Sequence, residues 1–168
     1  MNDQVLAELI HVVESKAVAN KLKPAVADVL DALIASPKEP QAWEPLQQDF
    51  FGARLPDGIK SGWLFALRNG AVFGNERHPN SWQPSIALQG AAEFELLLDG
   101  VWKKFVIHPS GSADGAVSIP PNVWHRIRIG PKVFVSLSFH TAPASELIEE
   151  TSEGDDLTRT KRRLYASH

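Results

Sequence analysis

Short runs of alternating apolar residues between positions 62 and 139 limit this chain to a mainly β fold. About eight such runs occur, separated by Gly, Pro, Asn and Asp, with no helical pattern among them. The predicted strands are 63–67, 71–73, 85–88, 93–98, 102–107, 116–119, 124–129 and 133–139. This many short strands in about 80 residues predicts an antiparallel barrel or jelly roll.

The dipeptide Asp99-Gly100 stands between two of these runs and predicts a tight hairpin. A type I′ turn needs positive φ at both central positions, and Asp-Gly supplies it. In the run before the turn, alternation directs the apolar side chains to the core and leaves Glu93 and Glu95 in solvent. In run 124–129 the same alternation places Arg126 and Arg128 on the outer surface.

Residues 1–50 form a helical extension in this prediction. Apolar residues recur at helical spacing in two stretches of the first 35 residues, and Pro24 suits the first turn of the second helix. Residues 20–23 would connect the helices into an amphipathic hairpin, and Pro37 with Pro40 would end it. Its apolar stripes must be buried either on the following domain or on a second copy of the chain.

The segment 143–168 is predicted to be a charged tail behind a barrel of residues 51–142. Six acidic residues lie between positions 146 and 156, and four basic residues between 159 and 163. Such blocks are typical of a solvated extension that pairs with itself or with the domain. Nucleic-acid binding by the basic block is the less favoured alternative.

Composition excludes several classes of function. The 168 residues include no cysteine, which removes disulfides, thiolate catalysis and cysteine metal sites. Residues 51–142 contain nine Lys/Arg against six Asp/Glu, too small an excess for a nucleic-acid binder. No secretory signal or membrane-spanning window is evident, so we expect a cytoplasmic protein whose ligand is a small molecule.

Three side chains in these runs are candidate metal ligands. Glu76 and His78 are two residues apart, so on a strand both point to one face, and His125 begins another alternating run. Two histidines and one carboxylate suit Fe(II), Mn(II), Ni(II), Zn(II) or Cu(II). The alternative is an exposed loop at Glu76 and His78, with His125 as a hydrogen-bonded barrel histidine.

Two motifs extend this site. The stretch Gly70-AVFGN-Glu76-R-His78-PNSW-Gln83-PSIALQ-Gly90 resembles the first cupin motif, G(X)5HXH(X)4E(X)6G, with Glu76 at the first His and Gln83 at the Glu. The stretch 114–125, DGAVSIPPNVWH, is similar to the second motif, G(X)5PXG(X)2H, with Asp114 and Asn122 at its glycines.

This resemblance covers residues 60–140 and implies a cupin-type antiparallel jelly-roll barrel. It also implies one divalent metal, Fe, Mn, Ni or Zn, held by Glu76, His78, Gln83 and His125. The usual ligand set has one negative charge, and here that charge moves from the third ligand position to the first.

The last run, 133–139, leaves its orientation open. If its even positions face the interior, Ser136, Ser138 and His140 line the pocket. The favoured interpretation directs the odd, apolar positions to the core and leaves His140 exposed at the strand end. His11 and His108 have no partner at ligand spacing and are predicted to be structural.

The resemblance implies a metal enzyme acting on a small oxygen-rich molecule, of dioxygenase or of sugar or uronate isomerase type. No catalytic residue beyond the ligands is apparent. The alternative is a non-catalytic cupin that binds a metabolite or a protein. Open sheet edges and two amphipathic helices predict a homodimer.

Overall fold

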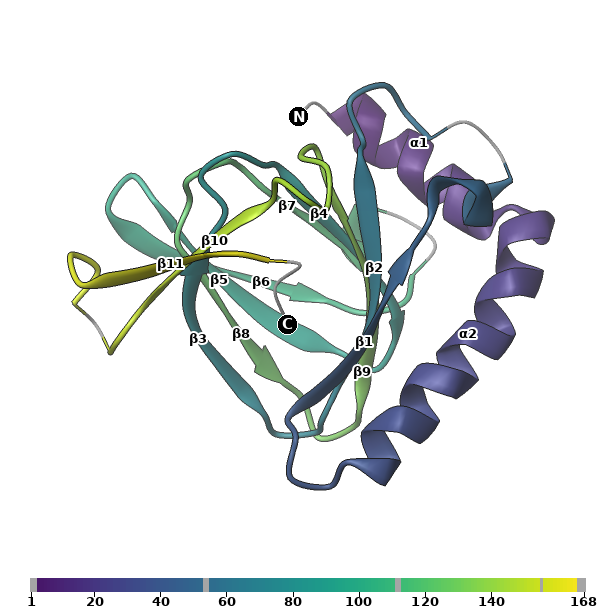
Figure 1. The fold of residues 1–168 in the computed structure, drawn as a ribbon, viewed down its shortest axis with the longest axis horizontal. Coiled ribbons are helices and arrows are strands. Elements are labelled where there is room, and N and C mark those ends of the chain that lie inside the picture. Colours follow the sequence, from purple (N-terminus) through teal and green to yellow (C-terminus); the bar gives the residue numbers. More distant parts are fainter. Residues whose placement is uncertain (1–2, 53–54, 111–112, 155, 166–168) are drawn as a thin grey trace.

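Two antiparallel sheets lie face to face in the computed structural model, which describes residues 3–52, 55–110, 113–154 and 156–165 (Figure 1). The five-stranded sheet has the order β1 (Gln41–Leu46), β2 (Ser61–Leu67), β9 (Phe134–His140), β4 (Gln83–Gln89) and β7 (Ala116–Ile119). The six-stranded sheet has the order β11 (Thr160–Leu164), β10 (Ile148–Ser152), β3 (Val72–Arg77), β8 (His125–Ile129), β5 (Ala92–Leu98) and β6 (Val101–Ile107).

The eight strands predicted from alternation are confirmed as β2 to β9. The predicted hairpin joins β5 to β6, where φ is 53° at Asp99 and 76° at Gly100. Between the sheets lies an apolar layer that includes Trp63, Phe94 and Phe134. Short 3-10 turns occur at Gln48–Phe51 and Ala113–Gly115.

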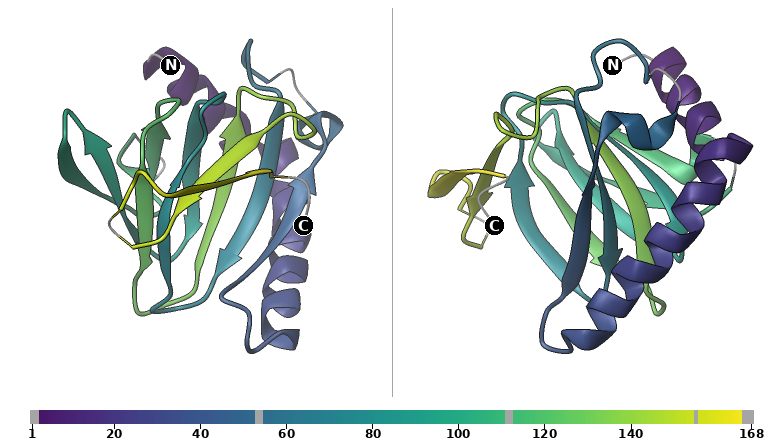
Figure 2. Two further views of the ribbon diagram at one scale, coloured as in Figure 1. Left: turned by 60° about the vertical axis from the view of Figure 1, so that its left-hand side comes forward. Right: turned by 45° about the vertical axis from the view of Figure 1, so that its right-hand side comes forward.

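Helices α1 (Asp3–Glu14) and α2 (Lys16–Ala35) cover the outer face of the five-stranded sheet (Figure 2). The predicted connection at residues 20–23 is wrong, because the break falls at Ser15, whose Oγ accepts a hydrogen bond from the Val18 amide. Pro24 lies inside α2, and the buried stripe runs past it: Val18, Leu22, Ala25, Val29 and Leu33. With one residue between them, the helices form a bent pair and do not fold back on each other (Figure 1). Neither helix is long and apolar enough to cross a membrane.

Strand β9 is buried on both faces, which corrects the prediction for its last residue. Its odd positions, such as Leu137, pack towards the helices, while its even positions face the opposite sheet. His140 is therefore 1% exposed, and the favoured interpretation that left it in solvent is wrong. A strand covered by a layer on each side shows no exposed face, so alternation alone cannot orient it.

The C-terminal segment pairs with itself and with the domain, as predicted, but β10 (Ile148–Ser152) is not solvated. Strand β10 pairs with β3 and β11 pairs with β10, so the segment extends the six-stranded sheet. Glu149 and Glu150 are 3% and 8% exposed. Ion pairs with Arg163 and Arg77 compensate these buried carboxylates.

Candidate metal centre

Neighbouring strands in the middle of the six-stranded sheet bring the three candidate ligands together. Glu76, near the end of β3, lies directly opposite His125, the first residue of β8. His78 follows the last residue of β3. Opposite residues of an antiparallel pair share a face, so Glu76 and His125 project to the same side.

One ligand atom from each of Glu76, His78 and His125 lies within 4.8 Å of the others. His125 Nε2 is 3.0 Å from Glu76 Oε1, and the two imidazole ring centres are 5.8 Å apart. His125 is fully buried and His78 is 3% exposed, while the Glu76 side chain is 23% exposed. The alternative that His78 lies in an exposed loop is therefore wrong.

Backbone carbonyls determine which ring nitrogens carry hydrogen. His78 Nδ1 lies 2.9 Å from the Ile148 carbonyl oxygen, and His125 Nδ1 lies 3.2 Å from that of Val123. A carbonyl oxygen only accepts, so both Nδ1 atoms donate and each neutral ring keeps its lone pair on Nε2. That lone pair of His125 then faces a carboxylate oxygen of Glu76, and two acceptors at 3.0 Å require a proton or a cation between them.

The ionisation states suit cation binding. Burial lowers the pKa of His78 to about 4, so its imidazole is neutral at neutral pH. Burial alone would raise the pKa of Glu76, but the hydrogen bond and charge of His125, with the charge of His78, lower it. A neutral imidazole at His78 and an ionised carboxylate at Glu76 are forms that bind metals.

A cavity of about 280 Å³ adjoins these ligands between the two sheets. Gln83 lines it from β4, is 6% exposed, and its Oε1 has no hydrogen-bond partner among the described residues. Ser136 and Ser138 also line the cavity, and Ser138 Oγ lies 2.8 Å from Ser85 Oγ. His140 lies beside them, with its ring centre 4.9 Å from that of His78.

Three residues at this site were missed by the sequence analysis, and all belong to the C-terminal segment. Glu149, Arg163 and Tyr165 line the cavity. Burial raises the pKa of Glu149, whose carboxyl group hydrogen-bonds Glu76. The Tyr165 ring centre is 5.6 Å from that of His78. The apolar pair 147–148 was the available signal that this segment returns to the core.

Other proteins share this architecture. The coconut allergen cocosin superposes with a TM-score of 0.53 at 16% identity, covering 68% of this chain and 29% of that one. A recombinant pumpkin pro-11S globulin gives 0.54 at 16% identity, over 68% of this chain and 28% of that one. A variant of Bacillus subtilis oxalate decarboxylase gives 0.52 at 19% identity, again over 68% and 28%. The chain has the cupin fold.

The cupin match is one of fold. No protein-family model and no curated protein matches the sequence. This chain spans under a third of the length of the three matched proteins. Since these include seed proteins as well as a decarboxylase, the fold alone does not select a function.

Proposed function

We propose that this cupin binds one divalent transition metal through Glu76, His78 and His125 and acts as a metal-dependent enzyme on a small oxygen-containing molecule. The observation that carries the proposal is the convergence of the three ligand atoms within 4.8 Å, beside an internal cavity. The unpartnered Oε1 of Gln83 supports the prediction of an amide oxygen as fourth ligand.

The surroundings of these ligands orient them. The Ile148 and Val123 carbonyls hold the two imidazoles in the tautomer that presents Nε2. A hydrogen bond between the carboxyl groups of Glu76 and Glu149 restricts Glu76 further. When bound, Fe(II), Mn(II), Ni(II) or Zn(II) would supply Lewis acidity towards a substrate oxygen and, in the case of iron, reactivity towards dioxygen.

The cavity walls are part apolar and part polar, so they favour neither oxygenase chemistry nor isomerisation of a sugar or uronate. Phe65, Phe73, Phe94 and Ile127 line the cavity. Polar side chains share the lining, among them Gln41, Asn75 and Ser136. A substrate with both an apolar part and hydrogen-bonding groups matches these walls.

Metal content tests the proposal directly. Protein purified without chelator should contain close to one transition metal per chain, or take up one equivalent of Fe(II), Mn(II), Ni(II) or Zn(II). His125→Ala should lower the metal affinity at least about tenfold, because it removes a ligand. His108→Ala is the matched control, since His108 is exposed, and it should bind metal as the parent does.

Elemental analysis and calorimetric titration provide the readouts, with circular dichroism to confirm that each variant is folded. A parent protein that neither contains nor takes up any of the four metals would contradict the proposal. Loss of metal in both histidine variants would also contradict it, because binding would then not depend on this site.

A non-catalytic binding protein is the second candidate, and the similarity to two seed globulin-type structures favours it. The two functions differ in oxygen consumption. If the protein is an oxygenase, its Fe(II)-loaded form should consume dioxygen when the substrate is present. A binding protein should take up its ligand without consuming dioxygen.

A further inference from the structure

The cavity opens along one side of the sandwich, between the edge strand of one sheet and the last hairpin of the other. Gln41 and Trp43 of β1 line it from the five-stranded sheet. Thr151 of β10 and Arg163 of β11 line it from the six-stranded sheet. Figure 1 shows β11 passing in front of the sandwich towards β1.

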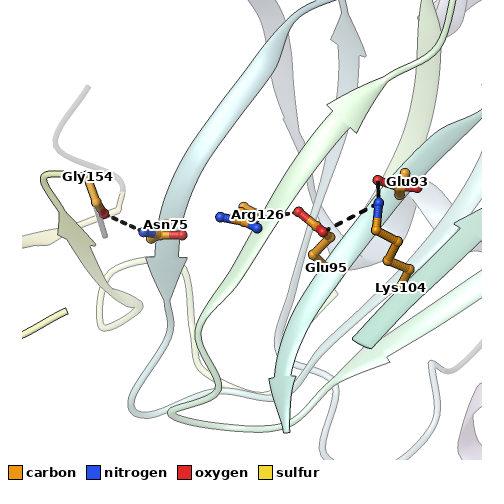
Figure 3. A network of polar contacts seen from close by, with 6 residues as sticks. All are labelled: Asn75, Glu93, Glu95, Lys104, Arg126 and Gly154. Atoms are coloured by element: carbon orange, nitrogen blue, oxygen red, sulfur yellow. Dashed lines mark hydrogen bonds and ion pairs between the residues drawn. The ribbon is translucent and has the colours of Figure 1, made fainter. Parts of the chain in front are cut away.

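The hairpin that carries Arg163 is held in place by polar contacts to β3. Asn75 Nδ2 donates a hydrogen bond of 2.6 Å to the Gly154 carbonyl, between β10 and β11 (Figure 3). Arg77 pairs with Glu150 at 2.7 Å on the outer side. These contacts to β3 therefore fix the position of Arg163 at the cavity.

Arg163 is the one Lys or Arg among the described residues that line the cavity. Its Nε donates to Glu149, whose side chain is 4% exposed, while the Arg163 side chain is half exposed. This bond orients the guanidinium and leaves its two terminal nitrogens as a fork for a ligand. Such a fork matches the two oxygens of a carboxylate.

The rest of the cavity limits what that carboxylate can be attached to. Aromatic side chains form part of the lining, namely Phe65, Phe73 and Phe94, and they suit a flat apolar body. A volume of about 280 Å³ is at the small end of ligand cavities. Apart from the proposed metal, a second carboxylate on this body would meet no further cation among the described lining residues.

We propose that the cavity binds a small monocarboxylic acid with a flat, apolar body, its carboxylate on the terminal nitrogens of Arg163. The inference rests on the proposed function, because it names the substrate class of the same site.

Benzoate and its neutral isostere benzamide test the proposal, by calorimetric titration of the full chain with and without added Zn(II). The parent should bind benzoate at least about tenfold more tightly than benzamide, as expected for a charge-assisted contact. Arg163→Gln should bring the two affinities within about threefold. Arg162→Gln is the matched control, because Arg162 pairs with Glu150 on the outer face, and it should keep the parent's preference.

Arg163→Lys keeps the charge beside Glu149 and removes the fork, so it replaces Arg163→Gln if that variant loses its thermal unfolding transition. Equal binding of benzoate and benzamide by the parent overturns the inference. So does a preference that is unchanged in the Arg163 variants, which would place the carboxylate elsewhere, for example on the metal. Metal uptake is measured on the same samples. A preference for benzoate without metal uptake contradicts the proposed function alone. Metal uptake without a preference for benzoate contradicts this inference alone.

Discussion

Positive φ angles explain why a glycine stands at each end of the first motif. Gly70 has φ of 72° and Gly90 has φ of 73°, a region that residues with a Cβ seldom adopt. In the second motif the corresponding glycine is replaced by Asn122, with φ of 64°. Asn tolerates the left-handed region better than most residues, so the turn before His125 keeps its shape.

Gly90→Ala should destabilise the fold by about 3 kcal/mol, from the left-handed backbone and a steric clash together. A Cβ there would lie 2.3 Å from the Val133 carbonyl oxygen, on the rigid backbone before β9. Gly154→Ala is the matched control: its φ is 61°, but a Cβ there meets nothing within 4 Å, so the cost should be about 1 kcal/mol. Urea unfolding measures both, and equal losses would contradict the clash.

At the residue scale the sequence predicted the three candidate ligands and missed their partners. Glu76, His78 and His125 could be found because strand alternation places them on one face. Glu149 and Arg163 could not, because charged residues are normally solvated and only the docking of the last hairpin buries Glu149 and brings Arg163 to the cavity.

Polar contacts between adjacent strands stabilise the outer face of the six-stranded sheet. Glu95 on β5 accepts a hydrogen bond from Arg126 on β8 and lies 3.7 Å from Lys104 on β6 (Figure 3). Glu95 was predicted to be solvated, yet it is only 8% exposed. The long side chains of Arg126 and Lys104 cover it, which a strand pattern does not show.

Glu95→Gln should lower the free energy of unfolding by about 1–2 kcal/mol at pH 7, because it removes a charge-assisted hydrogen bond. Arg126 holds the pKa of the Glu95 carboxyl below the ordinary 4.5. The ionised form therefore stabilises the fold above pH 4.5, and this contribution disappears as the pH falls through the folded-state pKa.

Denaturant unfolding of parent and variant between pH 7 and pH 3 measures the effect, and the two curves should converge towards acid pH. Glu93→Gln, which removes a more exposed partner of Lys104, should cost under about 1 kcal/mol. A difference between parent and Glu95→Gln that stays constant over this pH range would contradict the assignment.

Three layers make up the molecule: the helices, the five-stranded sheet and the six-stranded sheet (Figure 2). The apolar stripe of α2 is buried on the adjacent sheet, where Arg68 at the end of β2 also binds the Leu33 carbonyl at 2.7 Å. One of the two arguments for a homodimer, the unburied helical stripe, therefore no longer applies. The dimer stays a prediction that rests on the open sheet edges.

Leu33→Ala should cost about 2–5 kcal/mol, because the Leu33 side chain is 2% exposed and fills the layer between α2 and the sheet. The next residue is the matched control. Ile34 is 72% exposed, so Ile34→Ala should change stability by less than about 0.5 kcal/mol. Thermal unfolding distinguishes the two, and a small loss in Leu33→Ala would mean that the helices are not bound to the sheet.

For the whole molecule, the sequence predicted the central strands and missed β1, β10 and β11. β1 contains Glu44 and Pro45, and proline within a run argues against a central strand. β10 and β11 are rich in charge, and the burial of Glu149 and Glu150 on β10 depends on ion pairs formed only after docking. β1 and β11 are also edge strands, which carry weaker patterns because one side of each has no neighbour to specify.

The side opening of the cavity separates the parts of the site by element. The three metal-ligand candidates lie on or beside β3 and β8 in the interior of a sheet, whereas the entrance is formed by edge strands β1 and β11 and by β10 next to β11. Substitutions in edge strands disturb fewer neighbours than those in central strands. Selectivity for a ligand can therefore diverge among related chains, or be redesigned, by changing the entrance strands while the three candidate ligands stay intact.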